Sequence, residues 1–278
     1  MRFKLYREHG ALNSRPVFDA FQKGLESLGH TVVEKNEDVA VIWSVLWQGR
    51  MAMNQHIYHH CRNNNKPVII LEVGNLKRNH TWRVCLNHIN GLGIFGNSDN
   101  LDHERPEKLG VVLSPLNQHR RQEILIATQH QLSLQWEGMP SMNQWVSDTV
   151  QRIRQYSDRK IKVRGHPRSP LSVVLPNVEM ELPKRIEGSY DDFDIDYGYH
   201  CVVNHNSGPA VQAAIRGTPI ICDSSSLAGE ISGNFGNIET ITLPDRQDWF
   251  LKLCHTEWTV DEIEQGIPLK RLESQIII

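Results

Sequence analysis

The chain has 278 residues, of which 39% are hydrophobic and 22% charged, and a formal net charge of −2. This composition predicts a soluble globular protein of one or two α/β domains, and without net basic charge any nucleic-acid contact needs a local patch. The five cysteines have no short regular spacing, which argues against a disulfide framework or a zinc site, and the histidines are scattered. The first residues lack a signal peptide's apolar stretch, and no apolar run is long enough to span a bilayer. We therefore expect a cytoplasmic chain with no membrane segment and no metal.

The first part of the chain alternates short strands with helices. Strands are predicted over 3–6, 31–34, 39–44 and 68–72, and helices over 16–28 and 51–62. Pro16 suits the first turn of its helix and Gly29 the end. The strand over 68–72 is apolar and β-branched, which predicts a buried parallel strand with Glu72 at its carboxyl end. Residues 74–100 contain many Gly and Asn residues and are expected to be loop-rich.

A second alternation follows a boundary near 106–115, which ends in a strand predicted over 111–113. Further strands are predicted over 123–128, 160–164, 201–204 and 219–222, and helices over 142–154, 209–216, 246–254, 260–265 and 269–277. Ser141 is the expected N-cap of the helix over 142–154. Two such series predict an α/β protein with two Rossmann-like domains, residues 1–117 and 118–278, whose parallel sheets face a central cleft.

The strongest chemical signal is the segment 199–222. An apolar strand there ends at a short polar loop containing Asn206, Ser207 and Gly208, and Pro209 then opens a helix. Such a loop directs backbone N–H groups and a hydroxyl toward an anion at the helix N-terminus. The segment predicts a phosphate-binding loop, with an ordinary capped turn as the alternative.

A second signal lies at the end of the basic strand over 160–164. Arg164, His166 and Arg168 occur there, and open α/β sheets bind ligands at the carboxyl ends of their strands. These side chains can donate charge-assisted hydrogen bonds to a diphosphate or a sugar carboxylate. The alternative is a solvated basic edge.

Glu72 is the candidate general base, which would take the proton from an acceptor hydroxyl. A structural hydrogen bond or ion pair is the alternative. Three residues that follow Glu72 are candidates for contacts with the donor or the acceptor: Asn75, Lys77 and Arg78. Gln129 and His130 follow the strand over 123–128 and are also expected to point into the cleft. His130 is a candidate acid, base or phosphate contact, or else a loop histidine with satisfied hydrogen bonds.

The motifs at 164–168 and 206–219 resemble the two C-terminal motifs of the capsular-polysaccharide Kdo-transferase-like group, over roughly residues 123–228. This resemblance implies a GT-B architecture and an inverting, metal-independent transfer, with the nucleotide on the C-terminal domain and the acceptor on the N-terminal one. It assigns nucleotide contacts to His166, Arg168, Ser207 and Gly208. Two departures are Gly165, where the group has Pro, and Gln212, near a Glu that binds the donor ribose or sugar in many relatives. Gln212 therefore leaves the donor's identity open.

The whole chain also resembles compact bacteriophage glycosyltransferases, some of which modify hydroxymethylated pyrimidines in DNA. The predicted function is transfer of a sugar from a UDP- or CMP-linked donor to an acceptor hydroxyl, with no further cofactor. The favoured acceptor is a hydroxymethylated pyrimidine in double-stranded phage DNA, in the host cytoplasm. Two basic stretches, 77–83 with Trp82 and 119–121, favour that acceptor. The alternatives are a Kdo-type or other surface-polysaccharide transferase, a GT-B-like UDP-sugar 2-epimerase and a non-catalytic nucleotide-binding module. The oligomeric state stays open.

Overall fold

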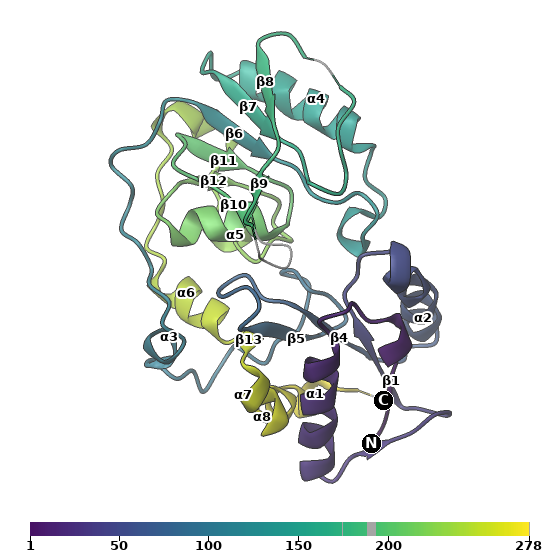
Figure 1. Cartoon of the computed structure of the whole chain (residues 1–278). Coiled ribbons are helices and arrows are strands. Elements are labelled where there is room, and N and C mark those ends of the chain that lie inside the picture. The colour runs from purple at the N-terminus through teal and green to yellow at the C-terminus, as the bar shows by residue number, and fades with distance from the viewer. Residues whose placement is uncertain (174, 188–192, 278) are drawn as a thin grey trace. The chain divides into compact units, whose positions relative to one another are not determined.

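The computed structural model describes residues 1–173, 175–187 and 193–277, and the chain forms two compact units (Figure 1). The first unit contains Met1–Val111, Leu132–Leu134 and Leu251–Ile278; the second contains Val112–Gln131 and Gln135–Phe250. The predicted division into 1–117 and 118–278 is therefore wrong for the end of the chain, which packs with the first unit. The sequence pattern shows that the C-terminal helices are amphipathic, but not which sheet they cover.

The first unit is built on a six-stranded sheet in the order β13-β5-β4-β3-β1-β2. Its strands are β1 (Arg2–Leu5), β2 (Thr31–Val32), β3 (Val39–Trp43), β4 (Val68–Val73), β5 (Trp82–Leu86) and β13 (Glu257–Trp258). The four strands predicted in this part are present and run parallel, whereas β5 and β13 pair antiparallel. The expectation of a loop-rich segment over 74–100 missed β5, because flanking Asn and Gly residues obscure its short apolar pattern.

Helices and short 3-10 turns pack around this sheet. They are η1 (Arg7–His9), α1 (Arg15–Ser27), η2 (Gly49–Met51), α2 (Ala52–Asn63), α3 (Arg105–Lys108), α7 (Val260–Glu264), α8 (Ile267–Leu272) and η6 (Glu273–Gln275). In α1 the buried residues Val17, Phe18, Phe21 and Leu25 form one face, and Gly29 adopts a φ of +76° just beyond its end. Helix α7 lies against α1 (Figure 1). The helix predicted over 269–277 begins earlier and ends at Leu272.

The second unit contains a five-stranded parallel sheet in the order β12-β11-β6-β7-β8. Its strands are β6 (Ile124–Ala127), β7 (Ile161–Arg164), β8 (Val178–Glu181), β11 (Cys201–Val203) and β12 (Ile220–Ile221). A small antiparallel pair joins β9 (Lys184–Arg185) and β10 (Phe193–Asp194). The strand predicted over 111–113 is wrong, since that segment has no regular structure. Strand β8 was missed because alternate charged residues hide it.

One face of this sheet is covered by α4 (Met142–Arg154), and α5 (Gly208–Ile215) connects β11 to β12. The other helices are α6 (Gln247–Cys254), which continues into the first unit, η3 (Leu134–Trp136), η4 (Gly229–Ile231) and η5 (Phe235–Thr240). Ser141 caps α4 as predicted, because its Oγ accepts a hydrogen bond from the Gln144 N–H at 3.2 Å. Val146 and Ile153 of α4 are fully buried against the sheet. Each such side chain contributes about 1.5–3 kcal/mol by burial.

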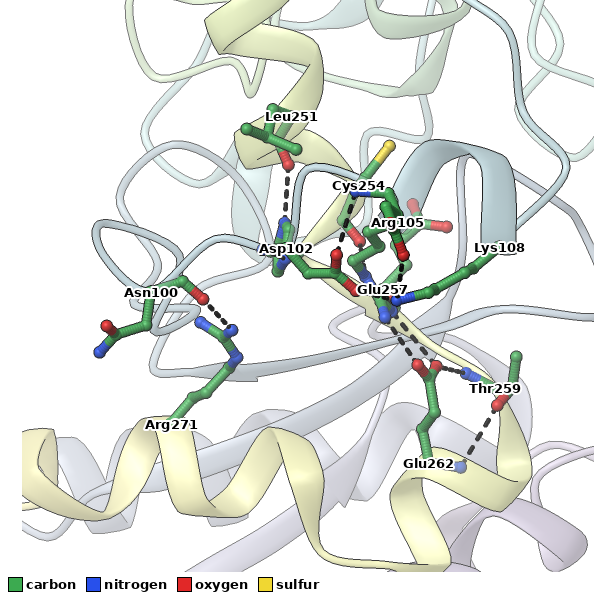
Figure 2. Close-up of polar contacts among 12 residues, drawn as sticks. Asn100, Asp102, Arg105, Lys108, Leu251, Cys254, Glu257, Thr259, Glu262 and Arg271 are labelled. Atoms are coloured by element: carbon green, nitrogen blue, oxygen red, sulfur yellow. Dashed lines mark hydrogen bonds and ion pairs between the residues drawn. The ribbon is translucent and has the colours of Figure 1, made fainter.

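Arg105 anchors the C-terminal segment to the first unit (Figure 2). Its side chain is 5% exposed and lies 4.0 Å from the ring centre of Trp258. The guanidinium donates to the carbonyl oxygens of Cys254 and Glu257 and pairs with Glu262 at 2.6 Å. Because a buried cation is stable only when its donors are paired, these contacts hold the segment against α3.

The Glu257 carboxylate makes the second anchor, at the loop that joins β4 to β5. It is fully buried and accepts hydrogen bonds from the backbone N–H groups of Asn75 and Leu76 and from the Thr81 hydroxyl at 2.7 Å. Any side chain at Gly74 would place its Cβ 2.3 Å from this carboxylate. The loop conformation therefore depends on a residue near the end of the chain.

Replacing Arg105 by Met is expected to destabilise the first unit by about 3 kcal/mol or more, because Glu262 and two carbonyl groups then lose their buried partner. The change is measured as a fall in the urea midpoint. Arg2→Met is the matched control, since Arg2 pairs with Asp38 at the surface with its side chain 54% exposed. Equal midpoints for the two variants would contradict the anchoring role of Arg105.

Candidate functional site

The strand order of the second unit identifies where a ligand is expected to bind. The chain enters the sheet at β6, adds β7 and β8 on one side, and then returns to add β11 and β12 on the other. The connections after β6 and β11 therefore leave the carboxyl edge in opposite directions, and open α/β sheets bind ligands at such a switch point. The predicted motifs after β7 and β11 lie on this one edge, on either side of β6 rather than on adjacent strands.

Gln129 and Asn206 join the two loops at this switch point. The Gln129 Nε2 donates to Asn206 Oδ1, and the Asn206 backbone N–H donates to Gln129 Oε1, both at 3.1 Å. Gln129 is 4% exposed and Asn206 6% exposed. The Asn206 side chain also donates to Ser225 Oγ after β12, and Gln135 donates to the Asn206 carbonyl. Neutral amides thus fix three loops without placing a charge at the switch point.

Ser207 and Gly208 begin α5 directly beside this amide pair. The Ser207 hydroxyl does not cap the helix; it accepts a hydrogen bond from Asn204 Nδ2 at 3.0 Å. Asn204 also accepts from the Ser207 N–H and donates to the Ala127 carbonyl, so it holds β11 to β6. The first-turn N–H groups of α5 lack a side-chain cap and carry the positive end of the helix dipole. Gln212, half-buried, lies one turn further along the helix.

Two histidine rings meet at the ends of β6 and β7. His130 and His166 pack edge to face with ring centres 5.3 Å apart. Burial lowers the pKa of His130, and the positive charge of Arg168 lowers it further. The backbone N–H of His166 donates to Thr128 Oγ1, and this hydrogen bond ties the loop after β7 to the end of β6. The Arg168 N–H donates to His166 Nδ1, so the neutral ring carries its proton on Nε2 as a hydrogen-bond donor.

Arg164 is placed differently from the other candidates. Its guanidinium is 8% exposed and pairs with Glu181 at 2.7 Å, and it also donates to the Asp196 carbonyl. In the register of β7 and β8, Lys162 lies opposite Glu179 as Arg164 lies opposite Glu181. Opposite charges on neighbouring strands stabilise the pairing of those strands. This geometry gives Arg164 a structural partner through Nε and Nη2, while its phosphate contact stays a prediction.

Glu72 lies in the first unit at the carboxyl end of β4, as predicted. Its carboxylate is half-buried and accepts a hydrogen bond from Ser44 Oγ at 2.6 Å and one from the Val73 N–H at 2.8 Å. Arg83 is its cross-strand neighbour on β5 but donates to the Val73 and Ile89 carbonyls. Among the residues that the structure describes, the groups bound to this carboxylate are therefore neutral donors.

The other first-unit candidates belong to the loop fixed by Glu257. The Asn75 backbone is committed to that carboxylate, while Lys77 and Arg78 are exposed. Lys77 takes part in the turn through its backbone, which accepts from the Thr81 N–H at 2.9 Å.

The basic stretches that favoured DNA are largely committed to internal contacts. Trp82 favoured DNA as an aromatic on which an extruded base could stack, but it is 5% exposed and packs against Trp43 with ring centres 5.7 Å apart, so its ring is not on the surface. Arg120 donates to the His200 carbonyl, and Arg121 pairs with Asp196 at 2.7 Å. Lys77 and Arg78 remain exposed.

Sequence reasoning missed several residues that build the site. They are Ser44, Thr128, Gln135, Asn204 and Ser225. Ser44, Thr128 and Asn204 each follow an apolar strand directly, and that position is a signal that could have found them. Gln135 and Ser225 lie in connections whose sequences show no motif or periodicity that would identify them.

Within residues 1–173, 175–187 and 193–277, no three His, Cys, Asp or Glu side chains are grouped to hold a metal ion. No helix in the same ranges is long and apolar enough to cross a bilayer. All five cysteines are free thiols.

Neither a protein-family model nor a curated protein sequence matches the chain. Among solved structures, the β-Kdo 2,4-transferase of KpsC from Thermosulfurimonas dismutans matches with a TM-score of 0.54 and 12% identity, over 91% of this chain and 89% of that one. The β-Kdo 2,7-transferase of the same KpsC matches with a TM-score of 0.51 and 13% identity, over 97% and 99%. The chain thus has the fold of these transferases, and the predicted GT-B-like α/β class with two Rossmann-like units is confirmed.

The neutral state of His130 can be tested by NMR. We expect the ring of His130 to titrate below the ordinary histidine midpoint of about 6.5, because burial and Arg168 both disfavour its charged form. Arg168→Gln should move this midpoint upward, since it removes the nearby positive charge. Lys160→Gln, on an exposed residue that precedes β7, is the control and should leave it unchanged. A His130 midpoint that stays the same in Arg168→Gln would contradict the contact.

Proposed function

We propose that the chain is a glycosyltransferase that binds a nucleotide-sugar donor at the carboxyl edge of the second unit's sheet. The observation that carries this proposal is the convergence of the loops after β6, β7 and β11 at the switch point, next to the uncapped start of α5. Switch-point crevices with helix N-termini bind nucleotide phosphates in other α/β proteins. Two structures with this fold are named as Kdo transferases, which supports the reaction class.

In this proposal the donor phosphates lie at the start of α5. The N–H groups near Ser207 and Gly208 bind phosphate oxygens, and Arg168 supplies the positive charge because it is exposed beside the switch point. His166 Nε2–H and the Gln212 side chain donate to the sugar or the ribose. Arg164 orders this edge through Glu181. The donor is UDP- or CMP-linked.

Acceptor activation is assigned to Glu72 in the first unit. Its carboxylate takes the proton from an acceptor hydroxyl while that oxygen attacks the anomeric carbon. The bond between the anomeric carbon and the phosphate oxygen breaks, and the nucleoside phosphate leaves with the electron pair. Attack from the face opposite the leaving group inverts the anomeric centre. Among the described residues, the groups bound to the Glu72 carboxylate are neutral, which supports this role because an ion pair would make a carboxylate a weaker base.

We propose a glycan hydroxyl as the acceptor, with a hydroxymethylated pyrimidine in DNA as the second candidate. Exposed Lys77 and Arg78 favour an anionic acceptor of either kind. Burial of Trp82 and the internal contacts of Arg120 and Arg121 weigh against DNA. A screen that offers oligosaccharides and hydroxymethylated DNA side by side separates the two, because salt weakens the binding of either anionic acceptor.

Glu72→Gln is expected to lower kcat by about 10²–10⁴ with little change in donor affinity, because the amide cannot accept the proton. The assay is a mass-spectrometric screen of UDP- and CMP-sugars against oligosaccharides and hydroxymethylated DNA. Glu107→Gln, on an exposed residue of α3, is the matched control. A wild-type transfer rate in Glu72→Gln would show that Glu72 is not the general base. Steady release of free sugar without an acceptor would instead indicate an epimerase.

Ser207→Ala is expected to weaken donor binding by about tenfold. The Ser207 hydroxyl accepts from Asn204 Nδ2 and is proposed to donate its own proton to a phosphate oxygen, so the substitution removes one hydrogen bond to a charged group. Isothermal titration with the donor found in the screen gives the affinity. Ser147→Ala is the control, because its hydroxyl donates to the Asn143 carbonyl on the surface of α4. Unchanged donor affinity in Ser207→Ala would contradict the placement of the phosphate site at the start of α5.

A further inference from the structure

Ser44 occupies an unusual backbone conformation at the end of β3. Its φ is +60°, in the left-handed region that non-glycine residues rarely adopt. The residue is 6% exposed, and its N–H continues the parallel ladder by donating to the Leu71 carbonyl at 2.8 Å. The preceding carbonyl of Trp43 accepts from the buried Asn54 side chain at 2.6 Å, so the strand end is held from both sides. Strained conformations of this kind persist where surrounding contacts determine them, and they cluster at functional sites.

The contacts of the Ser44 hydroxyl determine the direction of its proton. The Leu46 N–H donates to Oγ at 3.3 Å, so the hydroxyl accepts there. Its own hydrogen is then free for Glu72 Oε2, which lies 2.6 Å away. This hydrogen bond joins the end of β3 to the carboxylate on β4, and its direction fixes which carboxylate oxygen faces Ser44.

The two oxygens of Glu72 have different partners. Oε2 is bound by Ser44, and Oε1 accepts the N–H of the adjacent Val73 at 2.8 Å. Each oxygen keeps a further lone pair, because a carboxylate has about four acceptor positions in all. The Val73 contact joins two adjacent residues of β4. The Ser44 contact comes from the end of a different strand and therefore fixes the direction of the Glu72 side chain.

We propose that Ser44 is a positioning residue that holds the Glu72 carboxylate in the orientation needed to accept the acceptor's proton. The inference rests on the proposed role of Glu72 as the base. The left-handed conformation of Ser44 turns its hydroxyl from the end of β3 toward the end of β4. Ser44 does not contact the reacting atoms and acts through Glu72 alone.

Three substitutions separate the hydroxyl from the backbone conformation. Ser44→Gly removes the hydroxyl but accepts a positive φ without strain. Ser44→Asn keeps a hydrogen-bond donor and is a residue type that tolerates the left-handed region. Asn65→Gly is the matched control, because Asn65 also has a positive φ of +55° but lies in the turn between α2 and β4.

Ser44→Gly should lower kcat by about 10- to 100-fold with KM nearly unchanged, because the base is misplaced while binding is retained. Ser44→Asn should recover most of the lost rate, and Asn65→Gly should match the wild type. Wild-type kcat in Ser44→Gly, or no recovery in Ser44→Asn at wild-type melting temperature, would overturn the inference.

Crystal structures of the two Ser44 variants test the positioning without relying on activity. The Glu72 carboxylate should leave its wild-type position in Ser44→Gly and return to it in Ser44→Asn. An unmoved carboxylate in Ser44→Gly would contradict the inference even if the wild-type chain transfers sugar. If the wild-type chain transfers no sugar from any donor, the proposed function fails, while these structures still decide whether Ser44 orients Glu72.

Discussion

The buried carboxylate of Glu257 is the interaction on which the first unit depends most. Removing a carboxylate from water costs several kcal/mol unless donors surround it, and here the donors come from Asn75, Leu76 and Thr81. The same residue offers its carbonyl to Arg105, which also pairs with Glu262. One short strand near the end of the chain therefore fixes both the C-terminal helices and the loop that follows Glu72. This coupling explains why that loop is ordered although much of it is polar and exposed.

In the second unit, neutral side chains rather than a buried charge hold the loops in place. A site binds a negatively charged donor more strongly when its cationic side chains are not already paired with carboxylates, as they are in buried ion pairs. Gln129 and Asn206 instead lock the loops by reciprocal amide hydrogen bonds, and Asn204 ties β11 to β6. The Arg164–Glu181 pair is kept on the face of the sheet, while Arg168 stays exposed. The ion-paired Arg164 and the exposed Arg168 thus lie on different parts of the same strand end.

The local residue pattern predicted those strands and helices that can be recognised without knowing what they pack against. The apolar run of β4 and the capped, amphipathic α4 followed from residue order alone, and so did the placement of Glu72 at a strand end. Pairing could not be predicted in the same way. Glu257 carries no sign in the sequence that it binds a loop some 180 residues earlier, and nothing in the sequence pairs Arg164 with Glu181 on the neighbouring strand. Trp82 failed as a stacking surface for the same reason, because burial against Trp43 is a tertiary property.

The central claim is that a nucleotide sugar binds at the carboxyl edge of the second unit's sheet. Hydrogen exchange of the full chain, measured by mass spectrometry with and without UDP or CMP, tests it most directly. The account predicts slower exchange at the loops after β6, β7 and β11, in peptides containing His130, His166 and Ser207, while β2 at the edge of the first unit's sheet exchanges as before. Protection confined to other segments, or none at saturating nucleotide, would contradict the assignment of the donor site.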